Sequence, residues 1–142
     1  MEISDFGLGR PLEEGAQMIT LESTSRMAIK LIILLPFQIL PEHWHVDNGD
    51  IQAKQELIRV ISGHLDLYIN GSPEEAVLPV PELSLPYYTC KKKVVLKESE
   101  QMLIDPPNPH WLKAGNKGCV ALSFSTTAFD TKDVFRNPDI KR

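Results

Sequence analysis

Three of the four histidines in this sequence stand where they could bind one metal ion together with a glutamate. His43 and His45 are one residue apart, Glu56 lies in the next apolar stretch, and His110 comes much later. In an extended strand alternate side chains share a face, so His43 and His45 can reach the same ion. Imidazole and carboxylate ligands together suit divalent first-row metals. These four residues therefore predict a metal site, whereas His64 is expected to be a solvated or hydrogen-bonded structural residue.

The elements that carry these ligands can be read from the neighbouring residues. Residues 54–61 are rich in β-branched side chains with a period of two and run into Gly63, where we expect a turn. Glu56 would share a strand face with Lys54, one pleat away. His110 follows the Pro-Pro-Asn-Pro run at 106–109, whose fixed φ angles hold a rigid turn and present the next side chain in a defined direction.

Most of the chain is predicted to form short strands separated by turn residues. The expected strands are 17–21, 27–35, 54–61, 64–69, 94–96, 101–104 and 119–125. Four prolines exclude regular elements between residues 72 and 88, so a long surface loop is expected there, in a position to line the mouth of the site. A single helical turn is expected near 132–135. Many short strands in so short a chain favour an all-β fold, either a small barrel or a sandwich.

Composition is that of one globular domain. A chain of 142 residues with 42% hydrophobic residues suffices for one core, and we expect a single domain over residues 1–142. The net charge of -4, with no basic cluster larger than the lysines at 91–93, argues against a nucleic-acid partner. The apolar run at 28–40 is too short and too polar to cross a bilayer. Cys90 and Cys119 carry no mark of secretion and are expected to be reduced and buried in a cytoplasmic protein.

An ordered series of motifs extends over nearly the whole chain. It comprises residues 5–9, 41–45, 54–59, 67–71, 106–111, 124–127, 133–135 and 137–138. Six residues separate Glu56 from Gly63, while ten residues separate His45 from Glu56. The first spacing resembles the motif of the cupins. The ten-residue insertion, set between Pro-Glu-His-Trp-His and Lys-Gln-Glu, is similar to the cupin group of D-lyxose ketol-isomerases.

This resemblance implies a single small cupin (jelly-roll) β-barrel with little helix. It implies an aldose–ketose isomerase that moves a hydrogen between C1 and C2 of a pentose or hexose such as D-lyxose or D-mannose. The expected cofactor is a divalent metal, Mn2+ first, with Zn2+, Fe2+, Co2+ or Ni2+ as alternatives. Such an ion stabilises the negative charge of an enediolate, and four protein ligands leave up to two of six positions for the sugar. Many small cupins associate through the first strand or a sheet face, so a homodimer is expected.

Lys54 and Asp133 are the candidate catalytic residues. A lysine beside a cation can carry a proton or hydrogen-bond a sugar oxygen; the alternative is a lysine whose stem packs while its ammonium stays wet. Asp133 matches the family's carboxyl-terminal acid, but an aspartate that caps a short helical turn would look the same. Tyr88 and Trp111 are candidates for substrate binding by stacking on a sugar, with burial in the core as the alternative.

Two departures separate this chain from the group that it resembles. Ser123 stands where the group has an acidic residue, and a serine cannot take a carbon-bound proton unaided at neutral pH. The loop before His110 is one residue shorter. A metal-containing, sugar-binding cupin without turnover is therefore an alternative, and the ligand set equally suits an oxygen-dependent Fe(II) cupin. A purely structural metal, which only stabilises the barrel, would instead have a closed coordination sphere.

Overall fold

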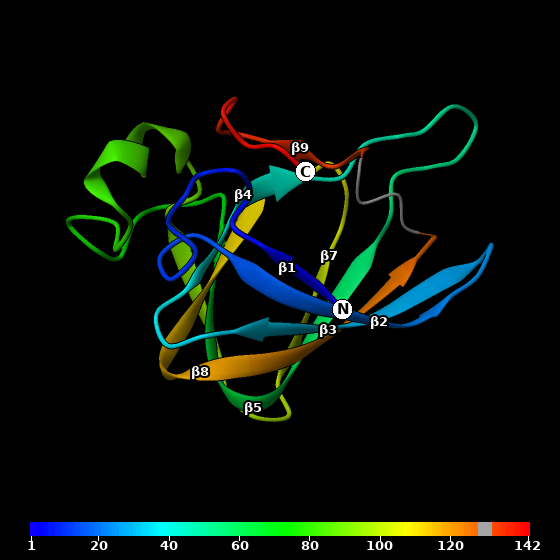
Figure 1. The fold of residues 1–142 in the computed structure, drawn as a ribbon, viewed down its shortest axis with the longest axis horizontal. Coiled ribbons are helices and arrows are strands. Elements are labelled where there is room, and N and C mark those ends of the chain that lie inside the picture. Colours follow the sequence, from blue (N-terminus) through cyan, green and yellow to red (C-terminus); the bar gives the residue numbers. More distant parts are fainter. Residues whose placement is uncertain (128–131) are drawn as a thin grey trace.

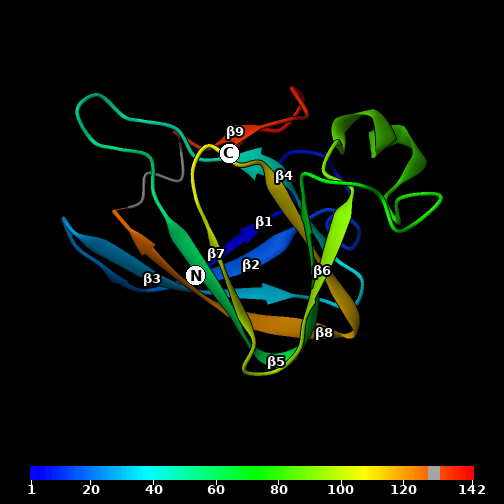
Figure 2. The ribbon, with the colours of Figure 1, turned by 180° about the vertical axis from the view of Figure 1, so that it is seen from behind.

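The computed structural model describes residues 1–127 and 132–142, and within them the chain forms one nine-stranded sheet and one short 3-10 helix. The strands are β1 (Glu2–Ser4), β2 (Ala16–Ser23), β3 (Met27–Leu34), β4 (Ile39–Trp44), β5 (Glu56–Ile69), β6 (Lys92–Leu96), β7 (Gln101–Ile104), β8 (His110–Thr126) and β9 (Val134–Phe135), and the helix is η1 (Glu82–Tyr87). The sheet curls on itself and encloses the core (Figures 1 and 2).

Two long strands, β5 and β8, connect the two halves of the curled sheet. The amino-terminal part of β8 pairs with β4, its carboxyl-terminal part pairs with β3, and β5 pairs with both parts. Strands β6 and β7 in turn pair with the two ends of β5. Residues on β4, β5 and β8 are thereby brought to one end of the interior, although they are far apart in the sequence.

The bend of the two long strands depends on Gly63 and Gly118. Both have positive φ, 79° and 75°, and a Cβ on Gly63 would lie 2.1 Å from the Gly118 carbonyl oxygen. Only glycine allows this close approach of two backbones. The expected turn at Gly63 was wrong, because β5 continues to Ile69 with an irregular register at this point.

The helical turn predicted near 132–135 does not extend past Lys132, which has 3-10 conformation. Val134 and Phe135 form β9, which pairs with the end of β4 through Trp44 and His43. Hydrogen bonding to a free strand edge satisfies the backbone here in place of a helical turn. This pairing brings the segment that carries Asp133 next to the histidines.

The core follows the alternation of the strands. On β3 the side chains of Ala28, Ile32 and Leu34 are buried, and they pack against inward residues of β2, β5 and β8. A second cluster forms around Trp111, beneath the loop at 72–88, and contains Ile39, Tyr68 and Tyr88. Both cysteines are buried and free, as predicted. No helix in the described part of the chain is long and apolar enough to span a membrane.

Candidate metal centre

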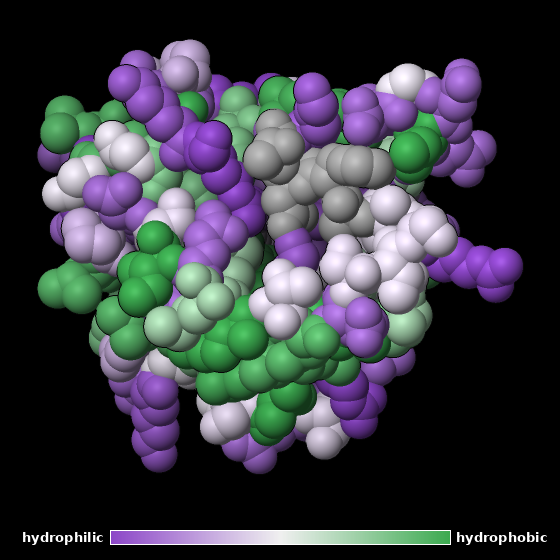
Figure 3. All heavy atoms as spheres, turned by 45° about the vertical axis from the view of Figure 1, so that its right-hand side comes forward, coloured by the Kyte–Doolittle hydropathy of each residue, from purple (hydrophilic) through white to green (hydrophobic). Residues whose placement is uncertain are grey.

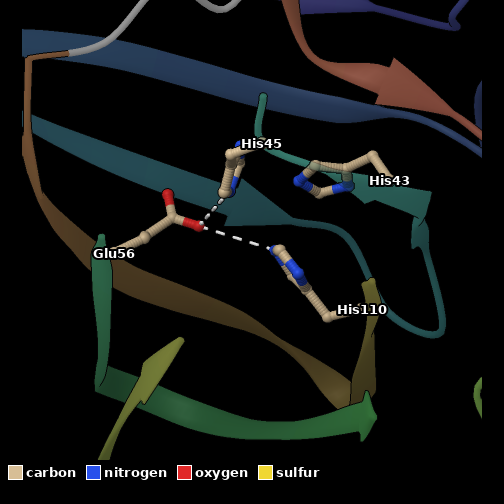
Figure 4. A group of neighbouring side chains, drawn as sticks. All are labelled: His43, His45, Glu56 and His110. Atoms are coloured by element: carbon tan, nitrogen blue, oxygen red, sulfur yellow. Dashed lines mark ion pairs between the residues drawn. The ribbon is translucent and has the colours of Figure 1, made fainter. Parts of the chain in front are cut away.

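The four predicted ligands meet at one end of the interior. His43 lies on β4, His45 directly follows it, Glu56 begins β5, and His110 begins β8. All four side chains are buried, and one potential ligand atom from each lies within 4.8 Å of the others. Figure 4 shows the three rings and the carboxylate converging on a common point. The prediction, made from residue types and spacing, that these four residues lie close together is therefore confirmed.

Each histidine in this cluster is oriented through its Nδ1 atom. The acceptors of the Nδ1 hydrogens are Pro41 O for His43 (2.8 Å), Asp133 Oδ1 for His45 (2.8 Å) and Asn108 O for His110 (3.0 Å). A carbonyl or carboxylate oxygen accepts here, so Nδ1 carries the proton, and in the neutral ring Nε2 keeps its lone pair. Hydrogen bonding of one ring nitrogen to an oxygen is how metal-binding histidines are usually oriented.

Two of the Nε2 atoms are placed to bind a cation. In the described part of the chain, Nε2 of His45 and Nε2 of His110 are buried and have no hydrogen-bond partner. Leaving a buried polar atom unpaired costs on the order of 1–3 kcal/mol. Oε1 of Glu56 lies 3.4 Å from the first of these atoms and 3.7 Å from the second. Imidazole nitrogens and a carboxylate oxygen held this close to one another suit a divalent metal ion.

The protonation of two of the ligands, His43 and Glu56, also suits a cation. For His45, burial would lower the pKa, but the hydrogen bond to Asp133 and the neighbouring Glu56 outweigh it and raise this pKa. Burial, together with the neighbouring His110 and His45, holds the pKa of His43 well below its usual value of 6.5, so this ring is neutral. Burial would raise the pKa of Glu56, but Lys54 and the two histidines outweigh it and hold this pKa well below its usual value. Metal ligands must be deprotonated, and these two are so at neutral pH.

The two candidate catalytic residues lie against the same cluster. The Lys54 side chain is only 8% exposed, and its Nζ lies 3.8 Å from Oε2 of Glu56 and 3.9 Å from Oδ2 of Asp133. Asp133 precedes β9, and its other oxygen accepts the hydrogen bond from His45. Burial would raise the pKa of Asp133, but the bond to His45 and the charge of Lys54 outweigh it and lower this pKa. The lysine is thus held between two carboxylates at the cluster.

Tyr88 and Trp111 are not brought to the histidine cluster. Trp111 follows His110 on β8 and points the opposite way, where its ring stacks on Tyr68 with centroids 3.8 Å apart. Its Nε1 donates to Cys90 O, and the Tyr88 hydroxyl donates to Glu14 Oε2 at 2.6 Å. Both aromatic rings are buried in the second hydrophobic cluster. Both side chains therefore pack in the core, which was the alternative interpretation of the sequence.

Lys30 and Arg142, which were not predicted from the sequence, line a small cavity together with His43, Glu56 and Ser123. Lys30 interrupts the apolar inward face of β3, between Ala28 and Ile32. A lysine among apolar inward residues is the feature of the sequence from which its place near the site could have been predicted. Burial, with Lys54 and Arg142 nearby, lowers the pKa of Lys30 to about 8.

A larger cavity opens beside His45. It has a volume of about 980 Å³ and lies between the 46–55 insertion and the turn at 105–107. Its lining includes the polar side chains of Asp47, Gln52, Gln55 and Asp105. This volume is within the range of about 300–1,000 Å³ that small-molecule pockets occupy. The loop at 72–88, which we expected at the mouth, instead covers Trp111.

A curled all-β sheet with three inward histidines and a glutamate at one end defines a cupin with a candidate metal centre. No protein-family model matches the chain. The chain is 37% identical to the D-lyxose ketol-isomerase of Cohnella laeviribosi over 143 residues, covering 100% of this chain and 79% of the relative. It is 36% identical, with the same coverage, to the D-lyxose/D-mannose isomerase of Thermosediminibacter oceani. The chain belongs to the D-lyxose ketol-isomerase family.

Solved structures confirm the fold. An L-ribose isomerase of Cellulomonas parahominis superposes with a TM-score of 0.78 at 14% identity, over 91% of this chain and 73% of that one. A cupin superfamily protein of Desulfitobacterium hafniense superposes with a TM-score of 0.55 at 12% identity, over 80% of this chain and 78% of that one. At such low identity these likenesses establish the architecture alone, and it is the cupin architecture predicted from the sequence.

Proposed function

We propose that this protein is a metal-dependent aldose–ketose isomerase that converts D-lyxose to D-xylulose or D-mannose to D-fructose. One observation carries the proposal: in a chain 37% identical to a D-lyxose ketol-isomerase, Lys54 lies 3.8 Å from a carboxylate of the candidate metal cluster. The reaction moves one proton from C2 to C1 and another from O2 to O1. It therefore requires a proton carrier beside a site that stabilises negative charge on both oxygens.

The metal in this proposal is held by His43, His45, Glu56 and His110. When bound, a divalent ion supplies Lewis-acid stabilisation of the negative charge that develops on the sugar oxygens. Mn2+ is the proposed ion, and Zn2+, Fe2+, Co2+ and Ni2+ suit the same donors. The buried, unpartnered Nε2 atoms of two histidines support this assignment.

Lys54 and Asp133 are the proposed proton-handling residues. In this proposal Lys54 takes the proton from C2, the C–H electron pair forms the C1–C2 double bond of an enediolate, and the π pair of the C1 carbonyl moves to O1. Lys54 then returns this proton to C1, where the C1–C2 π pair forms the new C–H bond. The proton on O2 passes to O1, and a lone pair of O2 forms the carbonyl at C2. Asp133 holds Lys54 through one oxygen and His45 through the other, so it keeps the proton carrier at a fixed position relative to the ligands.

The alternative from another class is a metal-containing, sugar-binding cupin without turnover. It is favoured by Ser123, which occupies the position of the family's acid and whose hydroxyl proton is engaged by Glu56. An oxygen-dependent Fe(II) cupin would use the same four ligands and differs in requiring iron and consuming oxygen.

The deciding experiment is ketose formation from D-lyxose and D-mannose by metal-free protein reloaded with Mn2+. His110→Ala removes one ligand, and His64→Ala is the matched control because His64 lies outside the cluster. Ketose produced by the wild type and His64→Ala, but not by His110→Ala, would support the isomerase. No ketose despite confirmed Mn2+ occupancy would support the sugar-binding protein, and oxygen uptake with Fe2+ would support the third class.

We also propose that the protein is a homodimer. On β3 the outward residues Ile29, Leu31 and Ile33 are apolar, and they pair across the sheet with Phe124, Leu122 and Val120 of β8. Figure 3 shows hydrophobic side chains gathered in a band across the lower part of one face. A sheet face exposed to water is usually polar. A face to which two neighbouring strands both contribute apolar side chains is therefore suited to being covered by a partner.

A second copy of the chain is the proposed partner, because the same apolar face on two copies can pack together under twofold symmetry. Leu31→Glu should convert the dimer to a monomer in light scattering after gel filtration. Leu83→Glu is the control, since Leu83 on η1 is 84% exposed and lies outside this face. A monomeric wild type at micromolar concentration would refute the dimer. A cytoplasmic location stays a prediction.

A further inference from the structure

The side chain of Ser123 contacts one of the candidate metal ligands. Its hydroxyl donates a hydrogen bond to Oε2 of Glu56 with an oxygen–oxygen distance of 2.5 Å. Both residues are buried, with 3% and 5% of their surface exposed. Short O–H···O⁻ bonds of about 2.5–2.7 Å are typical of a charged acceptor, and such bonds are roughly twice as strong as neutral ones.

The two oxygens of Glu56 have different surroundings. Oε1 faces the imidazole nitrogens of His45 and His110, at 3.4 Å and 3.7 Å. Oε2 faces away from them, toward the Ser123 hydroxyl at 2.5 Å and Lys54 Nζ at 3.8 Å. The carboxylate is therefore held with one oxygen toward the cluster and the other toward β8.

We propose that Ser123 is a positioning residue that holds Oε2 of Glu56, so that Glu56 presents Oε1 alone to the metal. This inference rests on the metal site of the proposed function. It gives the serine a task that an ionised acid at the same position could not perform, because an ionised carboxylate has no proton to donate.

The number of ligand atoms explains why it matters that Glu56 presents one oxygen and not two. Three imidazole nitrogens and one carboxylate oxygen leave two of six positions of an octahedral ion for two sugar oxygens. If Glu56 bound through both oxygens, only one position would remain, and the sugar could not bind through its carbonyl and hydroxyl oxygens together. Holding Oε2 on Ser123 keeps both positions for the substrate.

The chain offers a matched control in Ser125. This residue is the next inward side chain on β8, is 5% exposed, and pairs with Glu56 in the strand register. Within the described residues it makes no hydrogen bond to Glu56. Ser125→Ala therefore removes the same hydroxyl from the same buried face without removing the bond to the ligand.

The test compares the wild type with Ser123→Ala, Ser123→Thr and Ser125→Ala as metal-free full chains. Mn2+ affinity is measured by calorimetry, and the ligand geometry is followed by the visible absorption of added Co2+. Ser123→Ala should bind Mn2+ about 10–100-fold more weakly, the usual cost of losing a group that orients a ligand, and should change the Co2+ spectrum. Ser123→Thr keeps the hydroxyl and should restore both properties, while Ser125→Ala should match the wild type.

The inference is overturned if Ser123→Ala keeps the wild-type affinity and Co2+ spectrum, or if Ser125→Ala changes them as much. Where the alanine variant does not fold, Ser123→Cys replaces it, because a thiol of similar shape is a weak donor and should also weaken binding. A wild type that binds no metal would refute this inference and the proposed metal site together. A wild type that binds Mn2+ but makes no ketose would refute the isomerase alone, because affinity and spectrum still decide the role of Ser123.

Discussion

Asp133 accepts the Nδ1 hydrogen of His45 at 2.8 Å, although the two lie 88 positions apart in the sequence. The pairing of β9 with β4 sets this contact, because Val134 lies opposite Trp44 and each is the chain neighbour of one partner. The other carboxylate oxygen of Asp133 lies 3.9 Å from Lys54 Nζ. One aspartate thus connects a candidate metal ligand to the candidate proton carrier.

Asp133→Asn should weaken Mn2+ binding by about 10–100-fold, because the amide keeps the shape but loses the charge that orients and polarises His45. Calorimetric titration of the metal-free protein with Mn2+ measures this change. Asp139→Asn, at an exposed aspartate six residues further on, should bind like the wild type. Equal affinities of the Asp133 variant and the wild type would mean that His45 does not need this partner.

His110→Ala should abolish the stabilisation of the fold by Mn2+. A ligand at 100 times its dissociation constant adds about 2.7 kcal/mol to the free energy of unfolding, so the wild type should melt at a higher temperature when Mn2+ is added. Thermal unfolding with and without Mn2+ measures the difference. His64→Ala should respond like the wild type, and an unchanged response of His110→Ala would exclude His110 from the site.

Lys54→Met should lower kcat for ketose formation by about 10²–10⁴-fold, the usual contribution of a proton-transferring side chain, while Mn2+ binding stays within a few-fold. Exchange of the C2 hydrogen of D-lyxose with deuterated water should fall in parallel, because the same group removes this proton. Lys117→Met, at an exposed lysine, is the control. If kcat survives in Lys54→Met, the lysine only packs against the site.

The metal ligands were predictable from the sequence because their chemistry and their strand alternation are local properties. Two histidines one residue apart must share a face of a strand, and Glu56 begins the next strand, so neither inference needed the tertiary fold. His110 was predicted from the rigid turn before it. The second hydrogen-bonding partners of these residues were not predictable in this way.

The features that could not be predicted from the sequence depend on how strands distant in the sequence pair with one another. Gly63 looks like a turn residue in the sequence, yet it lies against Gly118 of β8. The two glycines together allow β5 and β8 to continue as long, bent strands. The contact between Ser123 and Glu56 likewise depends on how β8 lies against β5. Tyr88 and Trp111 were placed by side-chain type, and the second hydrophobic cluster determined their surroundings.

Lys30 should contribute an increase in the stability of the metal-free protein as the pH rises from about 8 to 10.5. Burial first, and then the charges of Lys54 and Arg142, lower its pKa from 10.5 to about 8, while Asp133 and Glu2 oppose the shift. Over this window the unfolded chain binds a proton that the folded protein has released. The contribution of Lys30 to the free energy of unfolding therefore increases with pH over this window, and below pH 8 the folded protein carries the full cost of the half-buried ammonium.

Lys30→Met keeps an unbranched side chain and removes the titrating group. The free energy of unfolding of this variant, measured relative to that of the wild type at the same pH, should fall between pH 8 and 10. The advantage of methionine should be largest near pH 7 and should shrink as the wild type loses its charge. Urea unfolding of metal-free protein at several pH values measures both slopes, with Lys117→Met as the control for loss of an exposed lysine. Parallel slopes for Lys30→Met and the wild type would show that Lys30 titrates as an ordinary surface lysine.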